Sequence, residues 1–389
     1  MKLFDRIDAV PALSAEEMQI LHSVRTLARE RVMPRAADYD RSGRFPWDNI
    51  NDINALGLNA MFVPEAYGGA ELSYAAYLAC VRELSQACAS TGIIWATNFH
   101  AMKPLIDYGT DEQKQRLLPR IAEGALASLA ITEPDAGSDA TQMTTRFTPR
   151  GDGIVVSGGK TFITNGDVAD LILVFGKWAG VGEARQAISA LIVEKGTPGF
   201  KVLRTEDKMG HRASSTAALA FEDCVVWRGN LLAGPGAGLP LLLSSLNKSR
   251  PSVAAHSLGI ARAAFDDAIA YVNERHQSGR RIIEFQGVQF LLADLAAELA
   301  LCQSWLWHVA RLVDSGASDF AAEASMLKLR ASDLAMRMTT EAVQLYGGYG
   351  YIKDFRVERL MRDAKITQIW EGTNQIHRQI IGRSLIVKE

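Results

Sequence analysis

The amino-acid sequence predicts a multidomain α+β protein in which a helical region, a β-rich region and a second helical region follow one another. Apolar residues recur at helical spacing up to about residue 125 and again after Leu239. Between these regions, short runs rich in β-branched residues alternate with glycine and proline. We therefore predict an N-terminal all-α domain over residues 1–128, a central antiparallel β domain over 129–238 and a C-terminal four-helix bundle over 239–389.

Helix-start signals support the N-terminal helical region. Ser14 is a candidate N-cap, and Glu17 three residues later completes a capping box. Thr110 and Gln113 repeat this spacing before another apolar run. The segment 74–108 is rich in alanine and leucine and is predicted to form two helices.

The β-rich region shows no helical pattern of useful length between its strands. Residues 151–164 are predicted to form a strand, a turn at Ser157-Gly158 and a second strand. Further strands are expected at 171–175, 187–193 and 217–221. Because helices do not separate these strands, we expect an antiparallel sheet rather than a βαβ array.

Four long amphipathic segments make up the C-terminal region. The third ends at the pair Gly347-Gly348, which is typical of a helix C-terminus. Long amphipathic helices separated by short breaks are typical of an antiparallel bundle. The predicted helices are 239–275, 284–313, 320–346 and 369–384.

Composition argues against several classes of partner. The 389 residues carry a net charge of −2, whereas nucleic-acid binding requires a surplus of basic residues on one face. We find no stretch of about twenty apolar residues that predicts a membrane span, and no apolar N-terminal run typical of a secretory signal. We therefore expect a cytoplasmic protein that binds neither nucleic acid nor membrane.

The cysteines and histidines predict no metal site. His100 lies in apolar surroundings, which favours a hydrogen-bonded core or interface histidine over a ligand. The cysteines show neither CxxC spacing nor a zinc pattern, so reduced and partly buried thiols are expected. They are Cys80, Cys88, Cys224 and Cys302.

Two segments near the start of the β-rich region carry groups that could hold a cofactor. Residues 131–139, ITEPDAGSD, combine hydroxyls, backbone N–H groups and a glycine turn, the materials of an anion cradle. Phe162 and Thr164 are two residues apart in a predicted strand, so both side chains face one side and could contact a flat ring. An ordinary loop and an ordinary strand end are the alternatives for these segments.

Near the C-terminus, Glu371 is the candidate catalytic residue. It follows Trp370 and precedes Gly372, whose missing side chain lets backbone pack close to a ligand. Such a carboxylate can act as a general base in a dry pocket. The alternative is a glutamate at a helix start, where the helix dipole favours it.

These segments resemble those of the acyl-CoA dehydrogenase family, as do DKMGHRASST at 207–216, VQLYGGYGY at 343–351 and RLMRDAKITQIWEGT at 359–373. The resemblance extends from Leu13 to Leu385, with the motifs in family order and at family spacing. It implies an acyl-CoA dehydrogenase-like fold with the same three domains. It also implies FAD, bound without a covalent link between the β domain, the bundle and a neighbouring subunit.

The resemblance also implies roles for individual residues. Glu371 would be the catalytic base, and no residue would bind a metal. Arg250 would lie near the CoA end of the substrate, although a surface arginine that caps a helix is an equal alternative. The implied substrate contacts are Ser138, Arg250, Trp370 and Gly372. The implied FAD contacts are Thr132, Ser138, Phe162, Thr164, Arg275, Gln277, Gln344, Gly348, Thr373 and Gln375, of which Arg275, Gln277, Gln344 and Gly348 would reach the cofactor of a neighbouring subunit.

The implied reaction is the α,β-dehydrogenation of an acyl-CoA thioester to a trans-2-enoyl-CoA. Glu371 would remove the α-proton while the β-hydride passes to flavin N5. A ribityl hydroxyl and the backbone N–H of Glu371 would stabilise the developing enolate. The resemblance further implies a homotetramer, an electron-transfer flavoprotein as electron acceptor and a place in the β-oxidation of fatty acids.

Other functions on the same scaffold stay open. They are an acyl-CoA oxidase, a flavin monooxygenase, a desulfinase-like lyase and, in a different class, a non-catalytic flavin- or acyl-binding protein. The presence of Glu371 favours dehydrogenation. Bulky residues expected around the substrate, in segment 95–100 and at Trp370, favour short, branched or aromatic acyl groups.

The sequence departs from the family pattern at one cofactor motif. Where the family reads Arg-x-x-Phe-Gly, this chain has RHQSG at 275–279. Ser278 therefore removes an aromatic surface that would cover the cofactor. Trp370 also stands where tyrosine is more frequent, which enlarges the aromatic wall of the expected substrate pocket.

Overall fold

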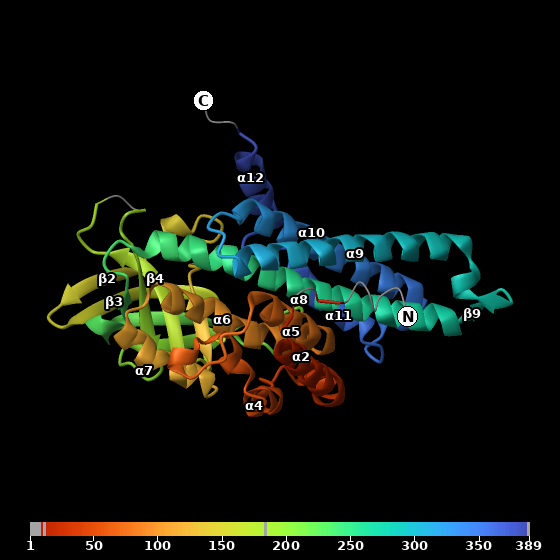
Figure 1. Cartoon of the computed structure of the whole chain (residues 1–389), viewed down its shortest axis with the longest axis horizontal. Helices are drawn as coiled ribbons and strands as arrows, with labels where there is room; N and C mark the ends of the chain where they lie inside the picture. Colours follow the sequence, from red (N-terminus) through yellow and green to blue (C-terminus); the bar gives the residue numbers. More distant parts are fainter. Residues whose placement is uncertain (1–8, 11–12, 183–184, 387–389) are drawn as a thin grey trace.

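The computed structural model describes residues 9–10, 13–182 and 185–386, and it confirms the predicted α+β fold class with its order of helical, β and helical regions. Figure 1 shows the sheet at one end of the molecule, with N-terminal helices beside it and the long C-terminal helices extending away from it. One apolar core joins all three regions. A site at their junction can therefore draw residues from each.

The N-terminal helices begin where the sequence predicts. The capping boxes of Ser14 with Glu17 and of Thr110 with Gln113 are both formed, which satisfies N–H groups that a helix start leaves unpaired. Residues 74–108 form two helices, as predicted. The helices are α2 (Ala15–Leu27), which continues through a π-helical turn (Ala28–Val32) into α3 (Met33–Ser42), then α4 (Trp47–Ala55), α5 (Tyr74–Ala87), α6 (Ala89–Tyr108) and α7 (Asp111–Ala122).

The central sheet is mostly antiparallel and includes two parallel pairings. Its strand order is β6-β7-β3-β2-β4-β5-β8, and β1 pairs with β4 at the side of this path. Both β1 and β2 run parallel to β4. The strands are β1 (Ala127–Ala130), β2 (Arg146–Arg150), β3 (Gly153–Thr164), β4 (Leu171–Trp178), β5 (Ile188–Glu194), β6 (Phe200–Thr205), β7 (Thr216–Trp227) and β8 (Leu231–Leu232).

The turn predicted at Ser157-Gly158 is wrong, because this segment belongs to a single strand, β3. The strand pairs with β7 on both sides of a register shift between Val156 and Gly158. Gly158 has φ +145°, and a Cβ there would lie 2.7 Å from backbone and side-chain atoms of Thr145. A β-bulge, which lets the strand bend without ending, therefore replaces the expected turn.

The C-terminal bundle contains one helix that the sequence analysis missed. α8 (Gly238–Glu274), α9 (Gln286–Asp314), α10 (Ala321–Tyr346) and α11 (Val357–Ile366) pack together, while α12 (Asn374–Ser384) projects from the body in Figure 1. The helix predicted from Ile369 instead begins at Asn374, after the N-cap Thr373. Glu371 and Gly372 have φ +50° and +92°, a left-handed backbone that a right-handed helix cannot contain.

The sheet is covered on both faces. Alternate residues of β4 demonstrate this: Leu173 and Phe175 face the core shared with the helices, whereas Ile172 and Val174 face a second core on the other side. The cysteines are free and buried, in agreement with the predicted thiols; they are Cys80, Cys88, Cys224 and Cys302.

Helix α9 presents an apolar face to its surroundings. Phe290 and Leu301 are 61% and 71% exposed. By length and composition alone α9 also qualifies as a membrane span, contrary to the sequence expectation, because an 18-residue window within it has a mean hydropathy of 1.2. In the structure it is a bundle helix whose other face enters the core through Leu292, Leu295 and Leu299. The exposed face therefore fits contact with another protein surface.

A buried ion pair fixes the loop that follows β1. Lys160 Nζ lies 2.8 Å from Glu133 Oε1, and the two side chains are 0% and 4% exposed. Glu133 also accepts the backbone N–H groups of Thr144 and Thr145, and Lys160 donates to Ile131 O. Although burial opposes ionisation, the adjacent Lys160 ammonium lowers the pKa of Glu133 to about 2. The pair thus anchors both ends of segment 131–145.

Replacing Glu133 by glutamine should destabilise the protein strongly, because it leaves the Lys160 charge buried without a partner. We expect the free energy of unfolding to fall by about 3–5 kcal/mol near neutral pH. Because the pKa of Glu133 is depressed on folding, its contribution is present above the ordinary value of 4.5 and is lost as pH falls toward about 2. The difference in free energy of unfolding between wild type and variant, measured with denaturant, should therefore become smaller as the pH falls from 4.5 toward about 2.

Glu222→Gln is the matched control for this prediction. Its carboxylate pairs with Lys201, but the two side chains are 61% and 55% exposed. An exposed pair contributes about 0–1 kcal/mol, so this variant should unfold almost like wild type. Equal effects of the two substitutions would contradict the role given to burial at Glu133.

Candidate active site

Glu371 lies in a left-handed turn between α11 and α12. Positive φ is uncommon for a residue with a side chain, and it persists where surrounding contacts impose it. Gly372 follows with φ +92°, and a Cβ there would lie 3.3 Å from His377 Nε2. The glutamate side chain is half-buried. The alternative of a helix-start glutamate is therefore wrong, since the turn separates Glu371 from the helix.

Two residues that the sequence analysis missed hold this turn against α10. Lys328 Nζ donates to Gly372 O at 2.8 Å and to Asn374 Oδ1 at 3.0 Å. The Asn374 side-chain amide donates to Ser332 and Asp333, and its backbone N–H closes the loop on Gln368 O at 3.0 Å. Lys328 is fully buried in the apolar stripe of α10. A lysine among the apolar residues of a predicted helix was the sequence signal that could have identified this residue.

Helix α8 contributes the groups closest to the carboxylate. Ser249 Oγ donates to Glu371 Oε2 at 2.6 Å. The neighbouring Arg250 is 6% exposed, donates to Asn247 Oδ1 at 2.8 Å and has no hydrogen-bond partner for Nε in the described residues. Arg250 is therefore buried inside the molecule, and the alternative of a surface arginine capping a helix is wrong.

Burial keeps the histidines around Glu371 neutral, and two buried basic side chains lie near it. Burial lowers the pKa of His100, and it lowers that of His377 to about 3, assisted by the charges of Lys328 and Arg250. Burial also lowers the pKa of Lys328 to about 7 and that of Arg250, while the negative charge of Glu371 opposes both shifts. Glu371 thus lies near two buried basic side chains whose charged forms it favours.

A hydrogen-bond donor also lies beside the carboxylate. The backbone N–H of Glu371 reaches no acceptor within the described part of the chain, and the left-handed turn leaves it outside any helix. A half-buried carboxylate can remove a proton from a bound substrate. A free N–H next to it can stabilise an oxygen on which negative charge develops.

Aromatic side chains fill the space between α5 and α6. The rings of Tyr77 and Phe99 stack with centroids 4.3 Å apart, and Trp95 lies 5.4 Å from Tyr77. All three residues are at most 4% exposed, and the charge of Glu371 acts on Tyr77. Segment 95–100, predicted to supply pocket residues, therefore forms packed core close to the site. Trp370 points elsewhere, with its ring 5.1 Å from that of His211.

Four predicted cofactor residues belong to the 131–139 loop and the end of β3, at one edge of the β domain. Thr161 N donates to Thr132 O at 2.9 Å, which joins the 131–139 loop to β3 between the ion pair and Phe162. Phe162 is 65% exposed with φ +59°, and Thr164 follows it near the strand end. Ser138 is exposed in the same loop. An exposed aromatic ring that does not pack in a core, on a residue with positive φ, is typical of a binding surface.

The loop 206–215 connects this edge to the Glu371 turn. Asn165, directly after Thr164, donates its backbone N–H to Ser215 O at 3.0 Å. The loop 206–215 also carries His211, whose ring contacts Trp370. Phe162 and Glu371 are thereby connected through one continuous set of contacts.

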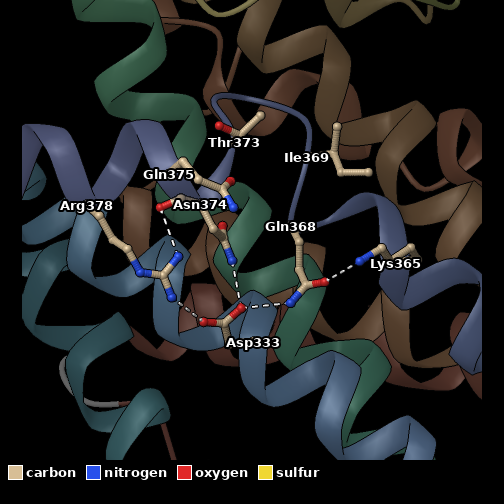
Figure 2. Close-up of a pocket in the computed structure, with 8 residues that line it drawn as sticks. All are labelled: Asp333, Lys365, Gln368, Ile369, Thr373, Asn374, Gln375 and Arg378. Atoms are coloured by element: carbon tan, nitrogen blue, oxygen red, sulfur yellow. Dashed lines mark hydrogen bonds and ion pairs between the residues drawn. The ribbon is translucent and has the colours of Figure 1, made fainter.

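Thr373 and Gln375 line a pocket of about 390 Å³ beside the start of α12. Figure 2 shows their side chains above the polar group of Asp333, Gln368 and Arg378. Arg378 lies 3.3 Å from Asp333, and Lys365 donates to Gln368 at 2.9 Å. The other residues of the wall are Ile369 and Asn374.

The remaining predicted cofactor residues lie at the opposite end of the bundle. Arg275 and Gln277 flank and enter the hairpin of β9 (His276–Gln277) and β10 (Arg280–Arg281), which Figure 1 shows far from the sheet. The Arg275 guanidinium lies 5.6 Å from the Tyr349 ring, next to Gly348 and near Gln344 at the end of α10. The single chain therefore does not bring these four residues to Phe162.

Ser278, which departs from the family motif, has a local backbone role. It has φ +52° and is followed by Gly279 with φ +78°, so the two residues form the turn of the β9–β10 hairpin. Two successive left-handed residues give a hairpin turn whose twist matches that of the strands. The polar side chain stands at the tip of the molecule.

The fold and the site define a three-domain enzyme with a candidate carboxylate base at the junction of its domains. Three family descriptions match the chain: the N-terminal domain of acyl-CoA dehydrogenase over residues 14–125, the middle domain over 128–224 and the C-terminal domain over 236–386. The chain belongs to the acyl-CoA dehydrogenase family. It is an oxidoreductase, and it shares acyl-CoA dehydrogenation with that family.

Individual relatives match over nearly their whole length. The short-chain specific acyl-CoA dehydrogenase of Clostridium acetobutylicum is 39% identical over 371 residues, covering 95% of this chain and 97% of that protein. Butyryl-CoA dehydrogenase of Megasphaera elsdenii superposes with a TM-score of 0.93 at 35% identity, covering 96% and 99%. A chain in the structure of the electron transferring flavoprotein of Acidaminococcus fermentans superposes with a TM-score of 0.93 at 39% identity, covering 97% and 100%.

Replacing Lys328 by methionine should loosen the catalytic turn. The change leaves Gly372 O and Asn374 Oδ1 without their common donor in a buried position, which should lower the free energy of unfolding by roughly 1–3 kcal/mol. Urea unfolding measures the change. Lys195→Met, at an exposed position, is the control and should unfold like wild type. A Lys328 variant as stable as wild type would contradict the role assigned to the amine.

Proposed function

We propose that this protein uses FAD to dehydrogenate a short-chain acyl-CoA thioester to a trans-2-enoyl-CoA, with Glu371 as the base. The observation that carries the proposal is the Glu371 turn. Its half-buried carboxylate accepts a hydrogen bond from Ser249 and lies near two buried basic side chains, Lys328 and Arg250. The backbone N–H of Glu371 has no acceptor in the described part of the chain. This combination supplies a base and an oxygen-stabilising donor at one position.

The residues present fit a flavin with a long polar extension. Phe162 offers an exposed flat ring, and the hydroxyl residues Thr132 and Thr164 stand beside it on the same edge. The pocket at Thr373 and Gln375 carries Lys365 and Arg378, whose charges suit phosphate oxygens. Bound FAD would supply the acceptor for the hydride that leaves the β-carbon.

Each protein group has a defined task in the proton-removal step. The Glu371 carboxylate takes the α-proton, and the Ser249 hydroxyl orients it by donating to Oε2. The backbone N–H of Glu371 donates to the thioester oxygen, which makes the α-proton more acidic. The buried Arg250 side chain lies close enough to Glu371 for the glutamate charge to act on its guanidinium. The packed helices exclude water and strengthen each of these interactions.

We propose short acyl groups as the substrate class, with branched or aromatic groups as the alternative. The packed rings of Tyr77, Phe99 and Trp95 limit the depth available near Glu371. The names of two relatives, a short-chain specific acyl-CoA dehydrogenase and a butyryl-CoA dehydrogenase, point in the same direction.

We also propose that the functional unit is an oligomer, with a homotetramer as the expected size. Arg275, Gln277, Gln344 and Gly348 lie too far from Phe162 to serve the same cofactor within one chain. The apolar face of α9 offers a surface for such contact. The similarity to a chain of an electron transferring flavoprotein structure supports a protein of that kind as electron acceptor.

Glu371→Gln is the direct test of the base. The amide keeps the size of the side chain and cannot take a proton. The variant should therefore still bind FAD, but butyryl-CoA should reduce this flavin under anaerobic conditions roughly 10²- to 10⁴-fold more slowly than in wild type. Stopped-flow absorbance of the flavin measures the rate. Glu222→Gln, remote from the site, should reduce like wild type. Reduction of the Glu371 variant at the wild-type rate would sink the assignment.

Acyl-chain preference should follow the packed aromatic cluster. Each methylene that the pocket cannot accommodate costs about 1–3 kcal/mol of discrimination, so the rate of anaerobic flavin reduction should fall steeply from butyryl-CoA to longer straight chains. A faster reaction with long chains would contradict the shallow pocket. Turnover of the same preparations in air distinguishes a dehydrogenase from an oxidase. Release of stoichiometric hydrogen peroxide would indicate an acyl-CoA oxidase.

A further inference from the structure

A buried pair of hydrogen-bonded histidines lies directly behind the Glu371 turn. His211 Nε2 and His256 Nε2 are 2.8 Å apart, and Ser85 Oγ lies 2.7 Å from His256 Nδ1. At the other end, Asp363 Oδ1 accepts the backbone N–H of His211 at 2.5 Å and lies 3.8 Å from His211 Nδ1. None of the four residues is more than 4% exposed. We call this set, Ser85, His256, His211 and Asp363, the histidine chain.

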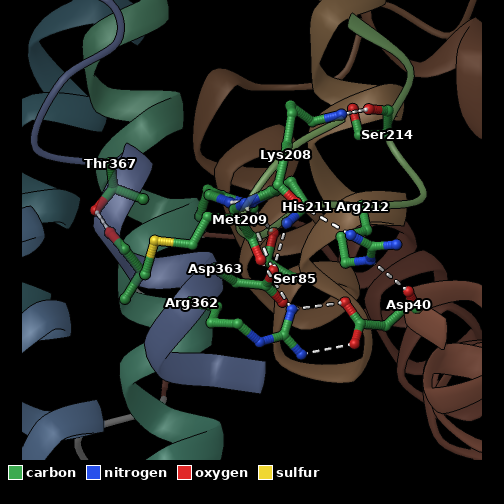
Figure 3. A network of polar contacts seen from close by, with 12 residues as sticks. Asp40, Ser85, Lys208, Met209, His211, Arg212, Ser214, Arg362, Asp363 and Thr367 are labelled. Carbon is green, nitrogen blue, oxygen red and sulfur yellow. Dashed lines mark hydrogen bonds and ion pairs between the residues drawn. The ribbon is translucent and has the colours of Figure 1, made fainter. Parts of the chain in front are cut away.

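The histidine chain ties all three domains together. Ser85 belongs to α5, His211 to the loop between β6 and β7, His256 to α8 and Asp363 to α11. Figure 3 shows Ser85, His211 and Asp363 converging from these separate elements. The loop is also seated tightly, because a Cβ on Gly210 would lie 2.4 Å from Arg362 O.

The protons of the histidine chain have a preferred direction. Burial lowers the pKa of His256 to about 3 and that of His211 well below its usual range, so both rings are neutral and share one N–H between them. Burial raises the pKa of Asp363 to about 7, but the backbone N–H of His211 favours its ionised form. A proton on His211 Nδ1 would face Asp363 Oδ1 at 3.8 Å, which is longer than a hydrogen bond.

A proton on His211 Nδ1 determines which atom donates in each of the other hydrogen bonds of the histidine chain. His211 Nε2 accepts from the Nε2–H of His256, and His256 Nδ1 accepts from the hydroxyl of Ser85. The reverse arrangement would set a ring lone pair of His211 against a carboxylate oxygen. This tautomer pair satisfies both His256 nitrogens, the Ser85 hydroxyl and His211 Nε2, and it leaves His211 Nδ1 without a hydrogen-bond partner in the described residues.

Trp370 rests on the two histidine rings. Its ring centroid is 5.1 Å from His211 and 5.6 Å from His256, at interplanar angles of 64° and 55°. Its indole N–H has no hydrogen-bond partner in the part of the chain that the structure describes, so ring contacts locate the side chain. Trp370 directly precedes Glu371, and a shift of its ring moves the backbone that carries the base.

Core stability alone does not account for this arrangement. Burying hydroxyl, imidazole and carboxylate groups costs desolvation free energy, and well-packed apolar residues of similar size would often be as stable. The hydrogen bonds between Ser85, His256 and His211 instead favour one arrangement of these residues, because another arrangement would leave further polar groups unpaired. In this arrangement the two histidine rings form the surface on which the Trp370 ring packs.

We propose that the histidine chain is a positioning device for the catalytic base: by holding Trp370, His211 and His256 set where the Glu371 carboxylate stands relative to the substrate α-carbon. The inference rests on the proposed function. His211 and His256 touch neither substrate nor cofactor in this assignment, so they are positioning residues. Their effect should appear in the rate of proton removal rather than in thioester binding.

His256→Leu is the principal test. It leaves the Ser85 hydroxyl and His211 Nε2 unpaired, so Trp370 loses its defined seat. Because misplacement of a reacting group by about 1 Å can cost around 10²-fold, we expect the limiting rate of anaerobic flavin reduction by butyryl-CoA to fall roughly 10- to 100-fold. The thioester concentration that gives half the limiting rate should change little.

Two further variants make the test specific. His256→Gln keeps a donor toward His211 and should recover most of the limiting rate. Ser257→Ala, on the same helix, removes a buried hydroxyl that donates to Val253 O within its own helix, and this variant should react like wild type. A readout without FAD comes from the apoprotein: His211→Leu and His256→Leu should each lower the thermal midpoint, and the double variant should lower it by less than their sum.

The outcomes separate this inference from the proposed function. A His256→Leu protein that reduces its bound FAD at the wild-type limiting rate would overturn the positioning role, whatever its thermal midpoint. If that variant does not fold, Ser85→Ala, which removes one hydroxyl, is judged by the same criterion. A wild-type protein that no acyl-CoA reduces would overturn the proposed function itself and with it the inference.

Discussion

The left-handed turn at Glu371 and Gly372 is the constraint on which the rest of the site depends. A glutamate does not adopt this backbone without help, because its side chain crowds the following carbonyl. Lys328 and Asn374 impose it by binding the turn to α10. The turn separates the carboxylate from α12, directs it to Ser249 of α8 and frees its backbone N–H. Base and oxygen-stabilising donor are thus consequences of one backbone conformation.

Buried polar groups gather where the domains meet, and they specify geometry at the expense of stability. The pair of Glu133 and Lys160 anchors the loop that carries Thr132, while Lys328 secures the turn that carries Glu371. Each buried charge costs desolvation that an apolar residue would not. Each also leaves only one arrangement in which its partners are satisfied. A site assembled from several domains depends on such buried polar contacts, because apolar contacts alone would let the domains shift relative to one another.

The candidate cofactor residues fall into two groups at opposite ends of the bundle. Thr132, Phe162 and Thr164 stand at the sheet edge near the base, whereas Arg275 and Gly348 lie beyond the far ends of α8 and α10. The length of the bundle helices keeps the groups apart within one chain. The exposed apolar face of α9 gives a physical reason for association. The oligomer is therefore part of the proposed site.

Local signals in the sequence determined the order of the domains, the helix starts at Ser14 and Thr110 and the choice of Glu371, because caps, periodicity and short motifs act between neighbours in the chain. The sequence analysis missed α11, the bulge at Gly158 and the true start of α12. Only the tertiary structure placed Lys328 under the turn, Ser249 on the carboxylate and His211 against His256. These contacts join residues tens to more than a hundred positions apart, and burial, which gives them their strength, exists only after the chain has folded.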